Sequence, residues 1–282
     1  MPRGTTGSEI TFVGHVSKDV NVVKGRREII PGGGVYYGSF AARSLGAKVK
    51  VVTKLNLNDK ELFSEMEDFG IKVVWIPSCS TTSIENVYPS DNPDERISRM
   101  VSKADPFTEG DIENLSGIVH ITPLWHGEFP EQLLERIRPK VKVLGGDAQG
   151  FLRNVSESGE MFYERPKSLE FLKFFNVFKL DSKEALVLTG KEGEEALREI
   201  ASFGVEEIVL TTKEGVYVHR DGKIAFARFG EWKMEGRTGR GDTAIASYLV
   251  LRREIDDTEK LAEEVARVTT LKMQRKGPYK GW

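Results

Sequence analysis

The feature that most constrains the fold is a regular alternation of β-rich and helix-like segments between Gly117 and Leu210. The segments follow one another in the order strand 118–121, helix 130–137, strand 141–144, helix 169–175, strand 177–180, helix 194–203 and strand 207–210. Repeated units of this length imply parallel strands joined by right-handed crossovers. We therefore expect an α/β protein with a doubly wound, mainly parallel sheet between two layers of helices.

The flanking segments extend this sheet and add hairpins. Further strands are expected at 10–14, 48–53 and 71–76, a helix at 59–69, and hairpins at 20–30, 81–101 and 216–228. With 282 residues, of which 39% are hydrophobic, the chain can bury one large core. We expect a loose tail at 1–8 and a single domain at 9–282.

Charge and cysteine content exclude several classes of protein. The net charge of −2 provides no overall field that would attract nucleic acid or a membrane surface. The single Cys79 cannot form an intramolecular disulfide, and no apolar run reaches the length of a bilayer span. The first residues also lack the apolar core of a signal peptide. We expect a cytoplasmic protein with no nucleic-acid or membrane partner.

A glycine turn that leads directly into an apolar helix is the strongest candidate for chemistry. Gly239 and Gly241 precede the almost entirely apolar run 244–251. Backbone amides of residues 240–242 at the start of this helix would form an anion cradle. Asp242 lies at its mouth, where a carboxylate repels phosphate but can accept a proton from a hydroxyl that attacks phosphate. The residues alone leave two roles open for Asp242, general base and N-terminal helix cap.

The run Thr238-Gly239-Arg240-Gly241-Asp242 resembles the Thr-Gly-Ala-Gly-Asp signature of the ribokinase-like (PfkB) carbohydrate kinases. Further matches occur in family order along nearly the whole chain. The resemblance implies a ribokinase-like fold with a small β-sheet lid, whose strands come from about 16–31 and 82–102. It also implies that Gly239, Arg240 and Gly241 stabilise the transferred phosphoryl group and that Asp242 is the general base. Arg240 replaces the usual Ala, and Gly236 replaces a frequent Asp.

Other matches imply contacts with the phosphoryl acceptor. Asp19 matches an early family Asp that holds sugar hydroxyls, a suitable role because a carboxylate accepts two hydrogen bonds. Gly33 and Gly34 resemble the family's Gly-Gly pair before a helix, where the backbone approaches a small polar ligand. Tyr37 stands where many members carry a substrate-binding Asn.

The segment after strand 141–144 narrows the acceptor class. Asp147 corresponds to a family Asp on the inner wall, and Gln149 follows it, although both could instead cap a loop. The run Asp-Ala-Gln-Gly-Phe at 147–151 looks most like the branch that includes myo-inositol kinases. We therefore expect a small sugar or cyclitol as substrate, with myo-inositol as the best guess.

The resemblance also implies ATP and Mg²⁺ as cofactors. Asp181-Ser-Lys-Glu184 resembles the Asn-x-x-Glu motif, in which Glu184 would hold the water shell of Mg²⁺. Asp181, in place of Asn, either strengthens the metal site or caps a helix. Helix 262–273 corresponds to one that flanks adenine. Together these matches predict ATP contacts at Thr211, Thr212, Lys213, Gly215, Thr238 and Lys272.

Two alternatives to an ATP-dependent carbohydrate kinase remain. A nucleoside kinase of the same fold would need aromatic rings around a base, for which Tyr36, Tyr37 and Trp75 are candidates. A catalytically silent sugar-binding regulator is disfavoured because Asp242 and Glu184 are both present. A nicotinamide-dependent dehydrogenase is disfavoured because no Gly-x-Gly-x-x-Gly follows the first strand. A homodimer through the lid is a further expectation.

Overall fold

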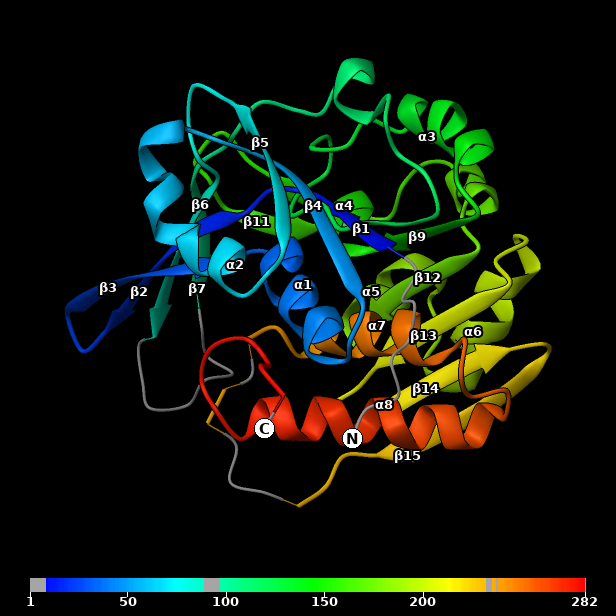
Figure 1. Ribbon diagram of the computed structural model, residues 1–282. Coiled ribbons are helices and arrows are strands. Elements are labelled where there is room, and N and C mark those ends of the chain that lie inside the picture. The colour runs from blue at the N-terminus through cyan, green and yellow to red at the C-terminus, as the bar shows by residue number, and fades with distance from the viewer. Residues whose placement is uncertain (1–8, 89–96, 232–234, 237, 282) are drawn as a thin grey trace.

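The computed structural model describes residues 9–88, 97–231, 235–236 and 238–281 (Figure 1). The predicted tail at 1–8 lies outside the described residues.

A nine-stranded sheet forms the centre of the molecule, in the order β15-β14-β13-β12-β9-β8-β1-β4-β5. Neighbours from β13 to β5 are parallel, and the β14–β15 hairpin adds an antiparallel edge. The strands of this sheet are β1 Glu9–Val13, β4 Lys48–Leu55, β5 Lys72–Pro77, β8 Ile118–Ile121, β9 Val143–Asp147, β12 Val177–Asp181, β13 Glu207–Thr211, β14 Gly215–Arg220 and β15 Lys223–Arg228.

Helices cover both faces of the sheet, and two hydrophobic clusters fill the layers between (Figure 1). Side chains of α1, α7 and α8 contribute to the cluster on one face, and those of α3, α4, α5 and α6 to the cluster on the other. The α-helices are α1 Gly34–Ser44, α2 Ser64–Asp68, α3 Gln132–Ile137, α4 Gln149–Leu152, α5 Ser182–Thr189, α6 Gly193–Ser202, α7 Arg240–Leu251 and α8 Thr258–Met273. Short 3₁₀ helices occupy Leu57–Phe63, Glu109–Ile112, Arg138–Lys140 and Glu170–Phe174.

A separate four-stranded sheet, the lid, lies beside the main sheet (Figure 1). Its order is β3-β2-β6-β7, with strands β2 Ser17–Val23, β3 Arg26–Gly32, β6 Ser83–Tyr88 and β7 Ile97–Ser102. Ile84 and Met100 of the lid pack with Leu124 and Trp125 of the main body, which identifies the inner face. On the outer face, Ile29, Ile97 and Val101 are 56%, 57% and 64% exposed. Arg27, Glu85 and Arg99 lie on the same outer face. A homodimer through the lid stays a prediction.

The expected α/β architecture and its lid are confirmed, with differences in local detail. The helix expected at 59–69 is a 3₁₀ helix followed by the short α2, and the one expected at 169–175 is the 3₁₀ helix Glu170–Phe174. Apolar spacing over so few residues does not separate a 3₁₀ helix from an α-helix. A two-stranded sheet of β10 Arg153–Val155 and β11 Met161–Tyr163 was not expected, because strands of three residues leave little periodicity to recognise.

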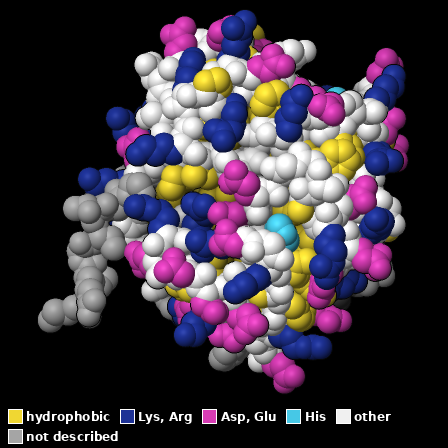
Figure 2. Space-filling view, turned by 90° about the vertical axis from the view of Figure 1, so that its right-hand side faces the viewer, with side chains coloured by type: hydrophobic (Ala, Val, Ile, Leu, Met, Phe, Trp, Pro, Cys, Tyr) yellow, Lys and Arg dark blue, Asp and Glu magenta, His cyan; other side chains and the backbone are white. Residues whose placement is uncertain are grey.

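The face of the molecule in Figure 2 carries charged side chains of both signs. On the face in Figure 2, Lys and Arg side chains are interspersed with Asp and Glu side chains, as the small net charge implies. None of the described helices combines the length and the apolar character that a bilayer crossing would need.

Candidate active site

Polar residues gather at the carboxyl edge of the parallel strands. His15 follows β1, Thr122 follows β8, and Asp147, Asp181 and Thr211 end β9, β12 and β13. Ligands in open α/β sheets bind at this edge. Because α7 begins beside the same edge, against β12 and β13, its N-terminus faces the same region.

The glycine turn before α7 has the geometry of an anion cradle. Gly239 is the N-cap of α7, with a left-handed φ of 82°. The amide of Thr243 donates to Gly239 O (2.9 Å) and so closes the first turn. The three preceding amides, of Arg240, Gly241 and Asp242, belong to positions that have no acceptor within a helix. They lie at the positive end of the helix dipole, where anions bind in other proteins.

Asp242 lies in the first turn of α7, three residues after the N-cap, so the alternative that it is the N-cap is wrong. It faces Gly34, the first residue of α1. A Cβ on Gly34 would lie 3.1 Å from Asp242 Oδ1 and would collide with Thr122 Oγ1. Glycine at position 34 therefore lets the Thr122 hydroxyl and the Asp242 carboxylate both approach the start of α1.

The environment of Asp242 suits proton transfer. Burial raises the pKa of its carboxyl to about 6, while Lys179 partly opposes this rise. The residue nevertheless keeps partial exposure to solvent, as a group that meets a ligand must. A carboxylate with this pKa is ionised at neutral pH and is a stronger base than an ordinary aspartate.

Lys179 of β12 places a cation against the cradle. A Cβ on Gly241 would lie 2.9 Å from Lys179 Nζ, so only glycine allows this approach. Burial alone would lower the pKa of this ammonium, but the carboxylates of Asp147 and Glu184 outweigh burial and raise it. Lys179 Nζ lies 3.2 Å from Asp147 Oδ1 and 3.8 Å from Glu184 Oε2. Lys179 is therefore a permanent charge beside the amides of α7.

The predicted inner-wall residues make defined contacts within the protein. Asp147 is buried, and its Oδ1 accepts from the Gln149 amide (3.2 Å) as well as from Lys179. The Gln149 side chain donates to Pro123 O at 3.3 Å. Both residues therefore have loop-capping contacts at the site, and their roles in acceptor binding stay predictions.

Glu184 and Asp181 form a capping box at the start of α5. Glu184 Oε2 accepts from the Asp181 amide (2.7 Å), and Asp181 Oδ1 accepts from the Glu184 amide (2.8 Å). Burial raises the pKa of the Glu184 carboxyl, with Lys179 opposing. Among the described residues, no group of three or more His, Cys, Asp or Glu side chains converges as a metal site. This arrangement fits Mg²⁺ only as an ion held mainly by phosphate and water, with Glu184 as one contact.

The inner face of the lid closes the site with polar side chains. Asn21 of β2 is the register partner of Asn86 of β6, so the two side chains lie on the same face of the lid. Asp19 lies on this face as well, because it is two residues from Asn21 along β2. Asn86 Nδ2 donates to Asn21 Oδ1 (3.3 Å), and Ser98 Oγ of β7 donates to Asn86 Oδ1 (2.7 Å). This chain of amide and hydroxyl groups can exchange hydrogen bonds with a ligand rich in hydroxyls.

Tyr37 connects this face to Asp242 and the glycine turn before α7. It is buried on α1, and burial raises the pKa of its hydroxyl, with smaller contributions from Asp19 and Asp242. Its ring also lies against Gly239, where any Cβ would collide with it. Gly33, with φ 98°, is the N-cap of α1. The predicted residues Asp19, Gly33, Gly34 and Asp242 are thus brought into one region.

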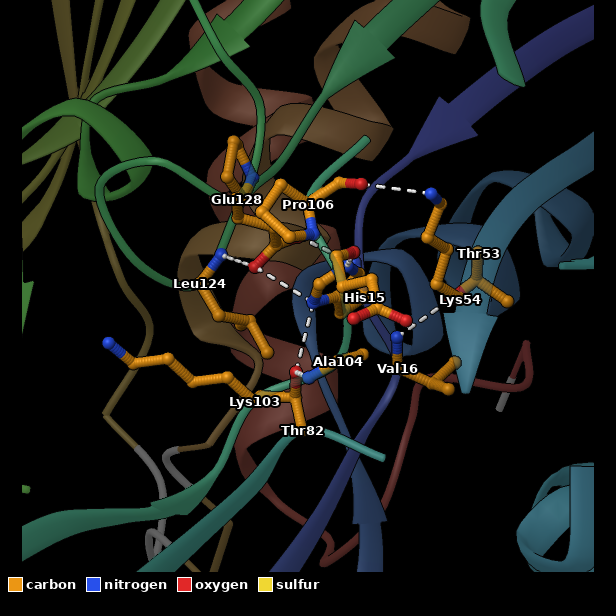
Figure 3. Close-up of polar contacts among 12 residues, drawn as sticks. His15, Val16, Thr53, Lys54, Thr82, Lys103, Ala104, Pro106, Leu124 and Glu128 are labelled. Atoms are coloured by element: carbon orange, nitrogen blue, oxygen red, sulfur yellow. Dashed lines mark hydrogen bonds and ion pairs between the residues drawn. The ribbon is translucent and has the colours of Figure 1, made fainter. Parts of the chain in front are cut away.

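A buried polar cluster joins the lid to the main body (Figure 3). Glu128 accepts from the amides of His15 and Leu124, each at 2.7 Å. The His15 ring contacts Thr82 Oγ1 (2.9 Å) next to β6, and Asp105 O (3.2 Å). Burial lowers the pKa of His15 to about 3, so the ring is neutral and structural.

The residues predicted to contact a nucleotide are only partly brought together. Thr211 is buried near Gly241, with its Oγ1 3.9 Å from where a Cβ there would lie. Thr212 Oγ1 accepts from the Gly215 amide (3.0 Å) inside the β13–β14 turn, where Lys213 is exposed. Thr238 is exposed beside the N-cap of α7. Lys272 is 1% exposed and points inward from α8.

Several residues at the site were missed by sequence reasoning. They are Thr122, Lys179, Asn86, Ser98 and Arg153. The Arg153 guanidinium donates to Tyr163 Oη (2.8 Å) and partly opposes the rise in the pKa of Asp242. Only Lys179 carried a local signal, because it is a lone charge inside the otherwise apolar run 177–180. The others depend on strand register and loop paths that no local pattern reveals.

Comparison with known proteins relates this site to kinases. No family model matches the chain. The solved structure of a pyrophosphate-dependent kinase in the ribokinase family, complexed with sulfate, is 46% identical, covers 96% of this chain and 97% of that chain, and has a TM-score of 0.89.

Two further relatives extend the comparison. One structure is of a pyrophosphate-dependent myo-inositol-1 kinase converted into a myo-inositol-3 kinase by changing an Asn and a Ser to Leu. It is 44% identical, covers 96% of this chain and 95% of that chain, and has a TM-score of 0.86. A cytidine kinase of Thermococcus kodakarensis is 26% identical over an alignment of 276 residues, and the match covers 92% of this chain and 95% of that protein.

Proposed function

Because the chain belongs to the ribokinase family of kinases, which transfer a phosphoryl group to a hydroxyl, we propose that it phosphorylates myo-inositol with inorganic pyrophosphate as donor. The observation that carries this proposal is the sequence identity of this chain to pyrophosphate-dependent kinases, one of which acts on myo-inositol. The identity is 44% to 46%, and each match covers 96% of this chain. The expected dependence on ATP is not confirmed by these relatives.

The polar inner face of the lid supports a polyol acceptor. Asp19, Asn21, Asn86 and Ser98 offer carboxylate, amide and hydroxyl groups toward the site, and Asp242 lies across from them. A ring with a hydroxyl on every carbon can bind to both the donors and the acceptors among these groups, because each hydroxyl can donate and accept a hydrogen bond. An apolar acceptor could not form hydrogen bonds with these groups and would bind weakly.

Contacts around α8 support a donor without a nucleobase. The Gly230 amide donates to Thr270 Oγ1 (3.0 Å), and the amides of Glu235 and Gly236 donate to Met273 O (3.0 Å). Thr270 and Met273 are each 5% exposed. The helix face expected to flank adenine is therefore covered by the chain's own preceding segment at these residues, which favours a small inorganic donor.

The proposed reaction uses groups that are already in place. Asp242 accepts the proton of the attacking hydroxyl, whose oxygen forms a bond to phosphorus while the bond to the leaving phosphate breaks. The leaving phosphate keeps the electron pair of the broken bond. The amides of residues 240–242 and the Lys179 ammonium neutralise the negative charge on the transferred group. Mg²⁺ bound to the donor would add to this neutralisation, with Glu184 holding part of its water shell.

One experiment separates the parts of the proposal. The protein is incubated with Mg²⁺, either pyrophosphate or ATP, and one of myo-inositol, ribose or cytidine, and ³¹P NMR follows the products. We expect an inositol phosphate and orthophosphate from pyrophosphate. Product from ATP alone would refute the proposed donor, and preferential phosphorylation of ribose or cytidine would refute the proposed acceptor.

The nucleoside kinase alternative finds less support in the aromatic residues. Tyr36 is buried in contact with Phe40, at 5.0 Å between ring centres, and its hydroxyl donates to Glu65. The Trp75 ring lies 6.4 Å from Phe63. These rings pack within the protein and do not form two faces of a base pocket. The cytidine arm of the experiment above tests this alternative directly.

Activity should fall in mild acid. Because the pKa of Asp242 is raised to about 6, its carboxyl is protonated below that pH and cannot accept the acceptor's proton. We expect kcat/KM, which reports the free enzyme, to fall about tenfold per pH unit below 6. A bound anionic donor should raise the pKa further, so the kcat profile should bend at a higher pH. Profiles that stay flat down to pH 5 would contradict this role.

Asn86 and Ser98 are proposed to determine which hydroxyl reacts, since an Asn and a Ser determine the product of the myo-inositol-1 kinase. The double variant Asn86→Leu/Ser98→Leu removes both the donor and the acceptor of the hydrogen bond between these side chains. Neither group of that bond therefore remains without its partner, as it would in a single variant. We expect a different inositol phosphate isomer, identified by NMR. Val87→Leu, on the opposite face of β6, is the control and should leave the isomer unchanged. An unchanged isomer from the double variant would contradict the assignment.

A further inference from the structure

Lys272 is a buried cation that phosphoryl transfer as described above does not use. It lies in the last turn of α8 and is 1% exposed, which is rare for lysine. Its Nζ donates to Gly236 O (2.9 Å) and lies 3.5 Å from Arg275 O. The ammonium therefore bridges two backbone carbonyls that are 39 residues apart in the sequence.

The two carbonyls belong to segments that support the anion cradle. Gly236 is three residues before Gly239, the N-cap of α7, and Arg275 is just beyond α8. The two segments touch so closely that a Cβ on Gly236 would collide with Arg275 O. Lys272 thus links Gly236, which lies close to the cradle, to the C-terminal end of α8. A cation is stabilised there by the negative end of the helix dipole.

The ammonium also faces the catalytic residues. Its Nζ lies 5.7 Å from the centre of the Tyr37 ring, and this ring packs against Gly239. Burial lowers the pKa of Lys272 to about 8, and Asp242 opposes this shift, so the two charges act on each other. At neutral pH the side chain is mostly a cation, close to the cradle but bonded to protein.

We propose that the Lys272 ammonium is a built-in cation that positions Gly236, close to the glycine turn at the start of α7, and adds positive potential to the anion cradle. It is a positioning residue, because it acts through the turn and not on the reacting atoms. The inference requires only the phosphotransferase activity of the family. It holds for either donor and for any acceptor.

Replacing Lys272 tests this role by kinetics. Lys272→Met removes the charge at similar volume, and displacement of the turn by an ångström should lower kcat by ~10²-fold. The KM of the acceptor should change little, since the acceptor contacts other residues. Lys272→Arg keeps the charge and should retain more activity than Lys272→Met. Equal kcat in these two variants, at matched Tm, would overturn the proposal.

Chemical rescue distinguishes a positioning cation from a merely structural lysine. In Lys272→Ala the two carbonyls remain beside a cavity, so ethylammonium should restore part of kcat while tetramethylammonium at equal ionic strength should not. Sulfate binding, measured by calorimetry, should weaken in Lys272→Met by about tenfold as the local potential falls. Lys260→Ala, at an exposed position of α8, is the control. Absence of rescue together with unchanged sulfate affinity would refute the role.

The activity of each variant is compared with that of the wild type, with the donor and the acceptor that the wild-type protein is found to use. A failure of the pyrophosphate or inositol assignment therefore leaves this test intact.

Discussion

Asp242→Asn should lower kcat by at least ~10²-fold, the usual contribution of a general base. The amide keeps the shape of the carboxyl but cannot accept the proton of the attacking hydroxyl. Because Asp242 faces Gly34 and is not the N-cap of α7, the variant should still bind donor and acceptor. Single-turnover kinetics with each substrate saturating would isolate the chemical step.

The same change should not weaken folding. Burial raises the pKa of Asp242, so its ionised form costs stability in the folded state at pH above about 6. Below that pH the group is protonated in the fold and this cost fades. Asp242→Asn should therefore keep or raise Tm at pH 8, and Asp68→Asn, at an exposed position of α2, is the control. Wild-type kcat in Asp242→Asn would remove the carboxylate from the mechanism.

Lys179→Met should reduce both catalysis and stability. Loss of a charge aimed at the transferred group should lower kcat by ~10²- to 10³-fold. The buried carboxylates of Asp147 and Glu184 would lose their shared cation, which should cost about 3 to 5 kcal/mol in the free energy of unfolding. Stopped assays at low temperature, with Tm measured on the same samples, would separate the two effects.

Gly241→Ala tests the same contact without removing the charge. The new Cβ would lie 2.7 Å from Lys179 Cε, and the flexible end of the lysine would move away from the cradle. Alanine also favours the helix, so the fold should be retained. If displacement of the ammonium causes the loss of activity, Lys179→Met/Gly241→Ala should be no slower than Lys179→Met alone. An additive loss would mean that the methyl group blocks the phosphate directly.

The sequence was sufficient to predict the parts of the fold that repeat. Alternating strands and helices predicted the parallel sheet, and Asp147 and Thr211, which the family resemblance singled out, both lie at the carboxyl ends of its strands. The glycine turn predicted the start of α7 within a few residues. The family resemblance then predicted that Gly34 and Asp242, which are more than 200 residues apart in the sequence, belong to one site. Local patterns alone could not have predicted this.

What the sequence did not predict depends on the direction of side chains. The contact of Lys272 with Gly236 O was not predicted, and the expected contact of Lys272 with a nucleotide stays a prediction. Asn86 and Ser98 meet only because β6 and β7 pair in one register, and a shift by one residue would turn each to the outer face. Such placements are fixed by tertiary packing and leave no signal in residue spacing.

The buried contacts of His15 and Glu128 determine how substrates can enter. His15 and Thr82 stand at the roots of β2 and β6, and both are fastened to the interior of the main body. These contacts oppose a rigid-body opening of the lid about this junction. We therefore expect the acceptor to enter by bending of the distal parts of the lid strands, while their roots stay fixed. Amide exchange that is slow near Thr82 and fast toward Val23 and Ile97 would be the signature of this motion.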